Sequence, residues 1–275
     1  MPSQQLKITD LETAFPPETI IATALGQPIS QAQLIRQMAQ VQIVYIGENH
    51  RNARHHVIQS ELIEALQTAW PDIVVGMEMF DVTYQTVLDK WSSGQLDEQR
   101  FLELTHWYAN WKFDFALYRP ILSSIKDHRL KLLGLNLPVQ IPPKISRGGI
   151  ASLQPEDARY LPDQIDLTNS AHRAFTQKTY QGHHHRIRGL ENFEYFYEAQ
   201  CAWEDTMAAT IAHNLDTRKM VVIIGNGHIF GKFGVPDRAF ARTGASFRTI
   251  CLVSAGQEIR RDVADYIWVT PNPHL

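Results

Sequence analysis

The feature that most constrains the fold is a set of short apolar runs in which apolar and polar residues do not alternate. A strand with one face in water alternates, whereas a strand covered on both faces is apolar throughout, as parallel sheets require. The runs are VQIVYIG (41–47), DIVVGMEMF (72–80), KLLGLN (131–136), MVVIIGNG (220–227) and FRTICLVSA (247–255). They predict the buried strands of a parallel sheet.

Longer segments between these runs carry apolar residues at spacings of three and four, which predicts amphipathic helices. The predicted helices are residues 53–69, 81–104 with a break near Ser92 to Gly94, 114–128 and 190–214. Alternating strands and helices indicate an α/β fold with a central, mostly parallel sheet flanked by helices. We expect an N-terminal extension over 1–39 and a single α/β domain over 40–275, in which the proline- and glycine-punctuated stretch 138–189 forms an irregular helical insertion or lid.

Composition excludes several classes of protein. The net charge of -3 lacks the basic excess of a nucleic-acid binder, so no nucleic-acid partner is expected. Cys201 and Cys251 form neither a disulfide framework nor a CxxC motif and are predicted to be core residues. No segment is long and apolar enough to span a bilayer, and the first twenty residues do not show the basic stretch followed by an apolar stretch that is typical of a secretory leader. The chain as written is expected in the cytoplasm, or in the periplasm or on a membrane if a leader was removed.

Polar residues stand where the predicted strands end. The run 41–47 continues into Glu48 and His50, and the run 220–225 continues into His228, so both close on Gly-x-x-His. Glu78 is predicted at the end of the next strand, and Asn136 ends another. Ligands of open parallel sheets bind outside the carboxyl ends of the strands. We therefore predict that Glu48, His50, Glu78 and His228 share one pocket.

This residue set leaves its chemistry open. Imidazole and carboxylate can hold a divalent metal with an open position, in which case His50, Glu78 and His228 are the ligands, or can perform acid–base catalysis. A histidine after a strand is often only a turn residue, and Glu48 could simply favour a helix N-terminus. Glu78 is not explained by a turn or a helix N-terminus, because it lies inside an apolar run, where burying an unpaired carboxylate would be energetically costly.

Other motifs in the sequence give weaker evidence for a functional site. GNGHIFG lacks the third glycine of a dinucleotide-binding GxGxxG motif. Three successive histidines, His183 to His185, cannot all point one way, so a basic loop over an anionic ligand is preferred to a metal site. The helix containing Gln200, Glu204 and Met207 on one face is interpreted mostly as amphipathic packing, with Asp205 pointing elsewhere.

The aromatic stretch HWYANWKFDFALYRPIL (106–122) is explained mostly as core packing. Tyr118 and Arg119, just before Pro120, fit a core less easily. A phenol there could ligate a metal or haem iron, and a guanidinium could bind an anion.

Six segments in order, YIGENH, VVGMEMFD, WKFDFALYRPIL, LLGLNLP, FYEAQCAWEDTMA and IIGNGHIFGKFGVPDR, resemble the ChaN-like haem-binding family of the Tiki/TraB and erythromycin-esterase superfamily. The resemblance covers about residues 40–255. It implies a Tiki/erythromycin-esterase-like α/β fold, haem binding in iron uptake for the ChaN branch, and metal-dependent hydrolysis for the Tiki branch. It further implies haem coordination by a tyrosine in dimeric members, which leaves a homodimer open here.

Two functional hypotheses follow. In the first, the chain binds haem or iron-porphyrin, with Tyr118 or a histidine as axial ligand and Arg119, Lys232 or the loop around His184 facing the propionates. In the second, it is a hydrolase of ester or peptide bonds, in which His50, His228 and Glu78 hold manganese, cobalt or zinc or activate water directly. Glu48 is then a general base or orients a neighbouring group.

Overall fold

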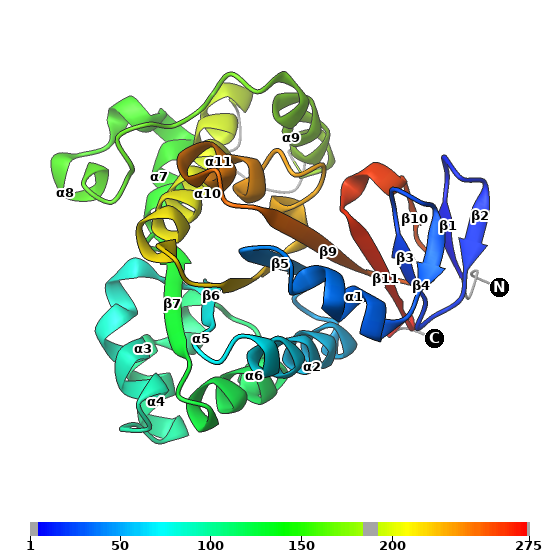
Figure 1. Ribbon diagram of the computed structural model, residues 1–275. Helices are drawn as coiled ribbons and strands as arrows, with labels where there is room; N and C mark the ends of the chain where they lie inside the picture. Colours follow the sequence, from blue (N-terminus) through cyan, green and yellow to red (C-terminus); the bar gives the residue numbers. More distant parts are fainter. Residues whose placement is uncertain (1–4, 184–191, 274–275) are drawn as a thin grey trace.

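A computed structural model describes residues 5–183 and 192–273 of the chain. Its centre is an eight-stranded sheet in the order β4-β3-β11-β9-β5-β8-β6-β7 (Figure 1). The strands are β3 (Ile20–Ala22), β4 (Gln27–Ile29), β5 (Ile43–Glu48), β6 (Val74–Asp81), β7 (Lys131–Asn136), β8 (Met220–Gly225), β9 (Phe247–Ser254) and β11 (Tyr266–Thr270). The six strands from β11 to β7 in this order pair in parallel. Each apolar run of the sequence contains one of them, so the predicted α/β fold with a mostly parallel sheet is confirmed.

Helices cover both faces of this sheet. Alternate residues of one strand enter different cores: Val44 and Ile46 of β5 pack in one, Ile43 and Tyr45 in the other. The first core lies under α1 (Gln31–Met38), α2 (Ala53–Ala69), α3 (Gln85–Ser92), α4 (Glu98–Thr105), α5 (Trp107–Asn110) and α6 (Phe115–Asp127). The second lies under α10 (Phe193–Leu215) and α11 (Val235–Thr243), on the opposite side of the sheet in Figure 1. Burial on both faces is why these strands are apolar throughout.

The predicted helices are present with small changes of boundary. Residues 53–69 form α2 as predicted, because the side chain of Asn52 caps its N-terminus by accepting from Arg54 N. Asp114 caps α6 in the same way. The break near Ser92 to Gly94 separates α3 from α4, and the short 3-10 turn η1 (Val82–Tyr84) precedes α3.

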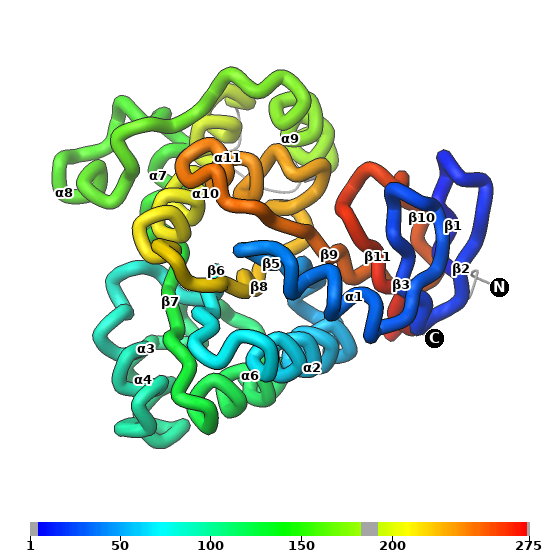
Figure 2. The backbone as a smooth tube through the Cα atoms, viewed as in Figure 1, coloured from blue at the N-terminus to red at the C-terminus, as the bar shows by residue number. Residues whose placement is uncertain are grey.

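The N-terminal segment joins the C-terminal one. Strand β3 pairs antiparallel with β11, which extends the central sheet beyond its parallel part. Strands β1 (Leu6–Ile8) and β2 (Thr13–Phe15) form a second sheet with β10 (Glu258–Ile259), on the right of Figure 2. Both termini therefore lie at this end of the molecule.

The predicted insertion is mostly helical where it is described. It contains α7 (Ile141–Gly148), η2 (Ile150–Ser152), α8 (Pro155–Ala158) and α9 (Ser170–His183). Ile141 and Ile145 of α7 pack on Ala199 and Ala202 of α10. In the described ranges no helix has the length and apolar character that crossing a membrane requires.

Candidate functional site

Four predicted site residues meet at the carboxyl ends of three adjacent strands. Glu48 ends β5, Glu78 lies in β6, and His228 lies in the 3-10 turn η3 (Asn226–His228) that follows β8. Nε2 of His50 lies 3.7 Å from Oε1 of Glu78, and Nε2 of His228 lies 3.9 Å from Oε2 of the same carboxylate. The order β5-β8-β6 in the sheet is what places both Gly-x-x-His motifs around Glu78.

Glu78 is buried but not unsatisfied. The backbone N–H of Gly225 donates to its Oε2 at 2.7 Å. The side chain of Asn136, also predicted for this edge, donates to the Glu78 carbonyl oxygen at 2.8 Å and so fixes the end of β6. A carboxylate between two imidazoles is therefore held in place by the backbone of the neighbouring strand.

The first histidine is held by a buried glutamate. Nδ1 of His50 lies 2.8 Å from Oε1 of Glu48, which also accepts a 2.7 Å hydrogen bond from the Tyr118 hydroxyl. Nδ1 of His56, on α2, lies 3.1 Å from the other Glu48 oxygen. The Trp111 ring packs against His50 edge to face at 4.9 Å. This group, Glu48 with His50, His56 and Tyr118, is called the first unit below.

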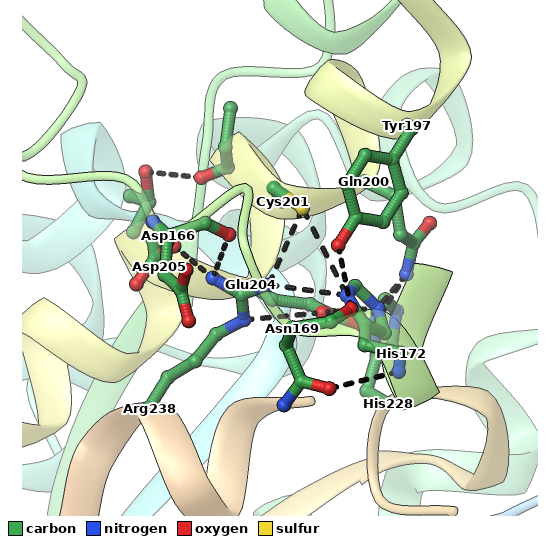
Figure 3. Close-up of polar contacts among 12 residues, drawn as sticks. Asp166, Asn169, His172, Tyr197, Gln200, Cys201, Glu204, Asp205, His228 and Arg238 are labelled. Atoms are coloured by element: carbon green, nitrogen blue, oxygen red, sulfur yellow. Dashed lines mark hydrogen bonds and ion pairs between the residues drawn. The ribbon is translucent and has the colours of Figure 1, made fainter. Parts of the chain in front are cut away.

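The second histidine is held in the same manner from the other face of the sheet. Nδ1 of His228 lies 3.1 Å from Oε1 of Glu204, on α10, and Gln200 donates to that oxygen at 2.8 Å. Nε2 of His172, on α9, lies 3.0 Å from Oε2 of Glu204 (Figure 3). The Trp203 ring packs on His228 at 5.1 Å. We call Glu204 with His228, His172 and Gln200 the second unit.

A buried ionic cluster supports the second unit. Nε of Arg238, on α11, lies 3.5 Å from Oε2 of Glu204. Another nitrogen of the same guanidinium pairs with Asp205. Arg242 also pairs with Asp205, at 2.6 Å. Figure 3 shows Arg238 reaching across between Asp205 and Glu204. Asp205 points away from His228, as expected from the sequence, and its partners are Arg238 and Arg242 of α11.

The two units are arranged alike around Glu78. In each, Nδ1 of the outer histidine faces a fully buried glutamate, Nε2 faces Glu78, and a second histidine approaches the glutamate. An ionised carboxylate only accepts hydrogen bonds, so Nδ1 carries the hydrogen and Nε2 is free to accept a proton. Carboxylates behind imidazoles fix the orientation of the ring and raise its basicity.

The pKa shifts agree with this arrangement. Burial alone would raise the pKa of Glu48, but the neighbouring imidazoles of His50 and His56 outweigh it and lower that pKa to about 2. Burial is likewise outweighed at Glu204, where His172 and His228 lower the pKa to about 2. Burial opposes the charged form of His50 and His228, yet the surrounding carboxylates leave the pKa of both imidazoles above the usual value.

The glycines of the two motifs have a steric role. A Cβ on Gly47 would lie 2.3 Å from Oδ1 of Asn226 and 2.5 Å from Cδ1 of Ile229, both in or next to the second motif. A Cβ on Gly225 would lie 3.0 Å from Cε1 of His50, in the first motif. Each Gly-x-x-His motif thus leaves room for the other, which explains why both contain glycine at the strand end.

The residues proposed to bind haem are not brought together. Tyr118 was predicted as a possible axial ligand of haem, but its side chain has no exposed surface and its hydroxyl donates to Glu48. Burial, together with the Glu48 charge, raises the pKa of Tyr118 and disfavours the phenolate. Arg119 points to the surface and pairs with Glu98, and Lys232 pairs with Asp265 at 2.7 Å. The prediction for His184 lies outside the described residues.

Several residues of the site were missed in the sequence. Glu204 was grouped with amphipathic packing, and His56 and His172 were not considered. One signal was available for Glu204, because it follows the apolar residues Cys201 to Trp203 and precedes Met207 by one helical turn, and an acid on such a face needs a buried partner. His56 and His172 give no such signal in the sequence.

The site opens to solvent on one side. The His50 side chain is 30% exposed, whereas that of His228 is 11% exposed and those of Glu48 and Glu204 have no exposed surface. Over the ranges 5–183 and 192–273, no group of three or more His, Cys, Asp or Glu residues has an arrangement able to hold a metal ion. The site presents two imidazoles, each with a carboxylate behind it, and solvent reaches them from the His50 side.

Comparison with known proteins identifies the family. Residues 34–239 match a family model described as haem-binding uptake, Tiki superfamily, ChaN. The chain belongs to this ChaN family. Its fold resembles that of ChaN of Campylobacter jejuni, a structure described as showing cofacial haem binding, with a TM-score of 0.73 and 21% identity over 90% of this chain and 95% of the other.

The ChaN-family fold extends to a known enzyme. An erythromycin esterase, the EreC H289N mutant in its open conformation, matches with a TM-score of 0.51 and 13% identity over 86% of this chain and 76% of that one. No curated protein sequence matches significantly. Together these results confirm the predicted family and the Tiki/erythromycin-esterase-like fold.

Proposed function

We propose that this protein binds haem and takes part in its uptake or handling. The observation that carries the proposal is the match of residues 34–239 to a haem-binding uptake family, a range that contains strands β5 to β8, both Gly-x-x-His motifs and helices α2 to α10. Haem, when bound, supplies an iron atom with axial positions for protein ligands. The residues of this chain must then supply an accessible ligand and cations for the propionates.

Tyr108 fits the ligand position better than Tyr118. Its side chain is 59% exposed, and it lies on α5, which leads directly into Trp111, the ring that packs on His50. Arg51, next to His50, and Lys112, next to Trp111, are exposed, and neither forms an ion pair with any residue that the structure describes. An exposed phenol on the helix before Trp111, together with available cations next to His50 and Trp111 in the sequence, suits an anionic porphyrin.

Haem titration followed by absorbance tests this proposal. The wild-type protein should bind haem saturably and give a Soret band typical of phenolate coordination, and Tyr108→Phe should shift that band and weaken binding. Tyr160→Phe, at a half-buried tyrosine on the other side of the sheet, is the matched control and should leave the spectrum unchanged. A Tyr108→Phe spectrum identical to wild type would reject Tyr108 as ligand, and absence of saturable binding would reject the function.

A second candidate function is hydrolysis of an ester or peptide bond. The observation that favours it is the convergence of two Nε2 atoms on Glu78, each imidazole backed by a buried carboxylate. One imidazole can remove a proton from water at Nε2 while the other, protonated, donates a proton to the leaving group, because their elevated pKa values favour the charged form. His50, the more exposed, is the candidate base, and Glu78 orients both rings.

An activated ester such as p-nitrophenyl acetate tests the chemistry, with and without added manganese, cobalt or zinc. His50→Gln and Glu78→Gln should each lower the rate by about 100-fold or more, the usual contribution of acid–base catalysis. Glu98→Gln, at an exposed glutamate, serves as the control. A wild-type rate no higher than that of buffer, or equal rates in wild type and His50→Gln, would remove this candidate.

A further inference from the structure

A groove of about 740 Å³ lies between α9 and the small sheet, and no residue of the first or second unit lines it. One wall is the α9 face formed by Ala171, Ala174, Phe175 and Lys178, which follow each other at helical spacing. The other walls come from the loop after His228 and from β10 with the adjoining turn η4 (Arg261–Val263). The volume falls within the range of small-molecule sites.

The interior of this groove is aromatic. Phe175 lies 5.9 Å from Phe230 and 5.5 Å from Phe233, measured between ring centres, and all three side chains are only partly buried. Ala171 and Ala174 are small and exposed, so space remains in front of the rings. Half-buried phenylalanines around an open space would gain free energy if an apolar molecule displaced water from them.

The charge at its rim is unbalanced. Arg260 pairs with Asp262, and Glu258 pairs with Lys7, so these lining charges are matched. Lys178 is exposed and forms no ion pair within the described ranges 5–183 and 192–273. The groove therefore offers an apolar wall with one available ammonium group at its edge.

We propose that this groove binds a small amphipathic carboxylate, an organic acid with an apolar chain or ring system. The apolar part packs on Phe175, Phe230 and Phe233, and the carboxylate pairs with Lys178. The site uses none of the residues proposed to hold haem or to perform hydrolysis, so it stands or fails independently of both.

The groove nevertheless adjoins the second unit. The Phe233 ring lies 5.6 Å from that of His172, whose Nε2 lies 3.0 Å from Glu204. Glu204 in turn faces His228. Contacts through His172 and Glu204 therefore connect the Phe233 wall of the groove with the His228 imidazole.

Binding of lauric acid, measured by calorimetry below its critical micelle concentration, tests the proposal. Wild-type protein should bind one molecule saturably, and 1-dodecanol, which lacks the carboxylate, should bind about fivefold more weakly, since an exposed ion pair contributes at most about that factor. Lys178→Gln should weaken lauric acid about fivefold and leave dodecanol unchanged. Ala174→Trp should fill the groove and abolish binding of both.

Two control variants separate these effects from general ones. Ala241→Trp places the same ring on an exposed position of α11, and Lys90→Gln removes a lysine from α3; both should bind as wild type. The proposal is overturned if lauric acid shows no saturable binding, if Ala174→Trp binds normally, or if acid and alcohol bind equally. Binding to phosphatidylglycerol vesicles without binding to free lauric acid would also overturn it, because the surface would then recognise a membrane.

Discussion

Arg238 offers a quantitative test of the ionic cluster behind the second unit. Its guanidinium is 3% exposed and faces two carboxylates, Glu204 and Asp205, that have no exposed surface. Arg238→Met keeps most of the apolar volume and removes the charge. Removing one partner of a buried ion pair costs about 3–5 kcal/mol, because the remaining charge stays buried without compensation.

The expected loss lies near the lower end of that range, at about 3 kcal/mol. Asp205 keeps Arg242 at 2.6 Å, and Glu204 keeps His172 at 3.0 Å. Arg119→Met is the matched control, because Arg119 pairs with Glu98 at the surface, where the two side chains are 49% and 40% exposed, respectively. Such exposed ion pairs contribute about 0–1 kcal/mol to stability.

Urea unfolding followed by circular dichroism measures both changes in the free energy of unfolding. Burial already raises the pKa of Asp205, and loss of Arg238 should raise it further. A carboxyl with a raised pKa contributes stability at low pH that is lost as pH rises, so the Arg238→Met deficit should be smaller at pH 5 than at pH 8. The reasoning is refuted if Arg238→Met lies within about 1 kcal/mol of wild type, as the control should.

Three further predictions concern the site. Gly47→Ala should lower the free energy of unfolding by about 1–3 kcal/mol, because its Cβ would lie 2.3 Å from Asn226 and 2.5 Å from Ile229. Gly225→Ala should lower it less, because its Cβ would lie 3.0 Å from His50, and should instead shift the His50 resonances in NMR spectra. Equal losses for the two variants in urea unfolding would contradict this prediction. The pKa of Glu48 is lowered to about 2 from its usual 4.5, so its contribution to stability is present above pH 4.5 and is lost as the pH falls through about 2. Glu48→Gln should therefore reduce the dependence of the free energy of unfolding on pH in the acid range. Glu258→Gln, at an exposed glutamate, should leave that dependence unchanged. If His50, Glu78 and His228 hold a divalent ion, His228→Ala should abolish binding of that ion. Acid should also release the ion, because an imidazole must be neutral to coordinate a metal. A wild-type protein that binds no manganese, cobalt or zinc would rule out the metal alternative.

Much of the fold was predictable because its signals are local. Residues 131–136 and 53–69 were predicted with the boundaries that the structure shows, since a doubly buried strand and a capped helix are each determined by their own residues. Strands β1 to β4 were not predicted, because three-residue strands carry too little periodicity.

The candidate site was likewise predictable from the sequence only in part. The sequence by itself determined that Glu48, His50, Glu78 and His228 come at strand ends, and the common direction of parallel strands then places them at one edge of the sheet. Only the tertiary structure decided what stands behind them. Glu204, on a helix of the opposite layer, reaches His228, while Tyr118 is buried against Glu48 instead of facing a ligand. Strand order is imposed by a repeating backbone geometry, whereas contacts between layers depend on how helices distant in sequence pack, which local sequence patterns do not contain.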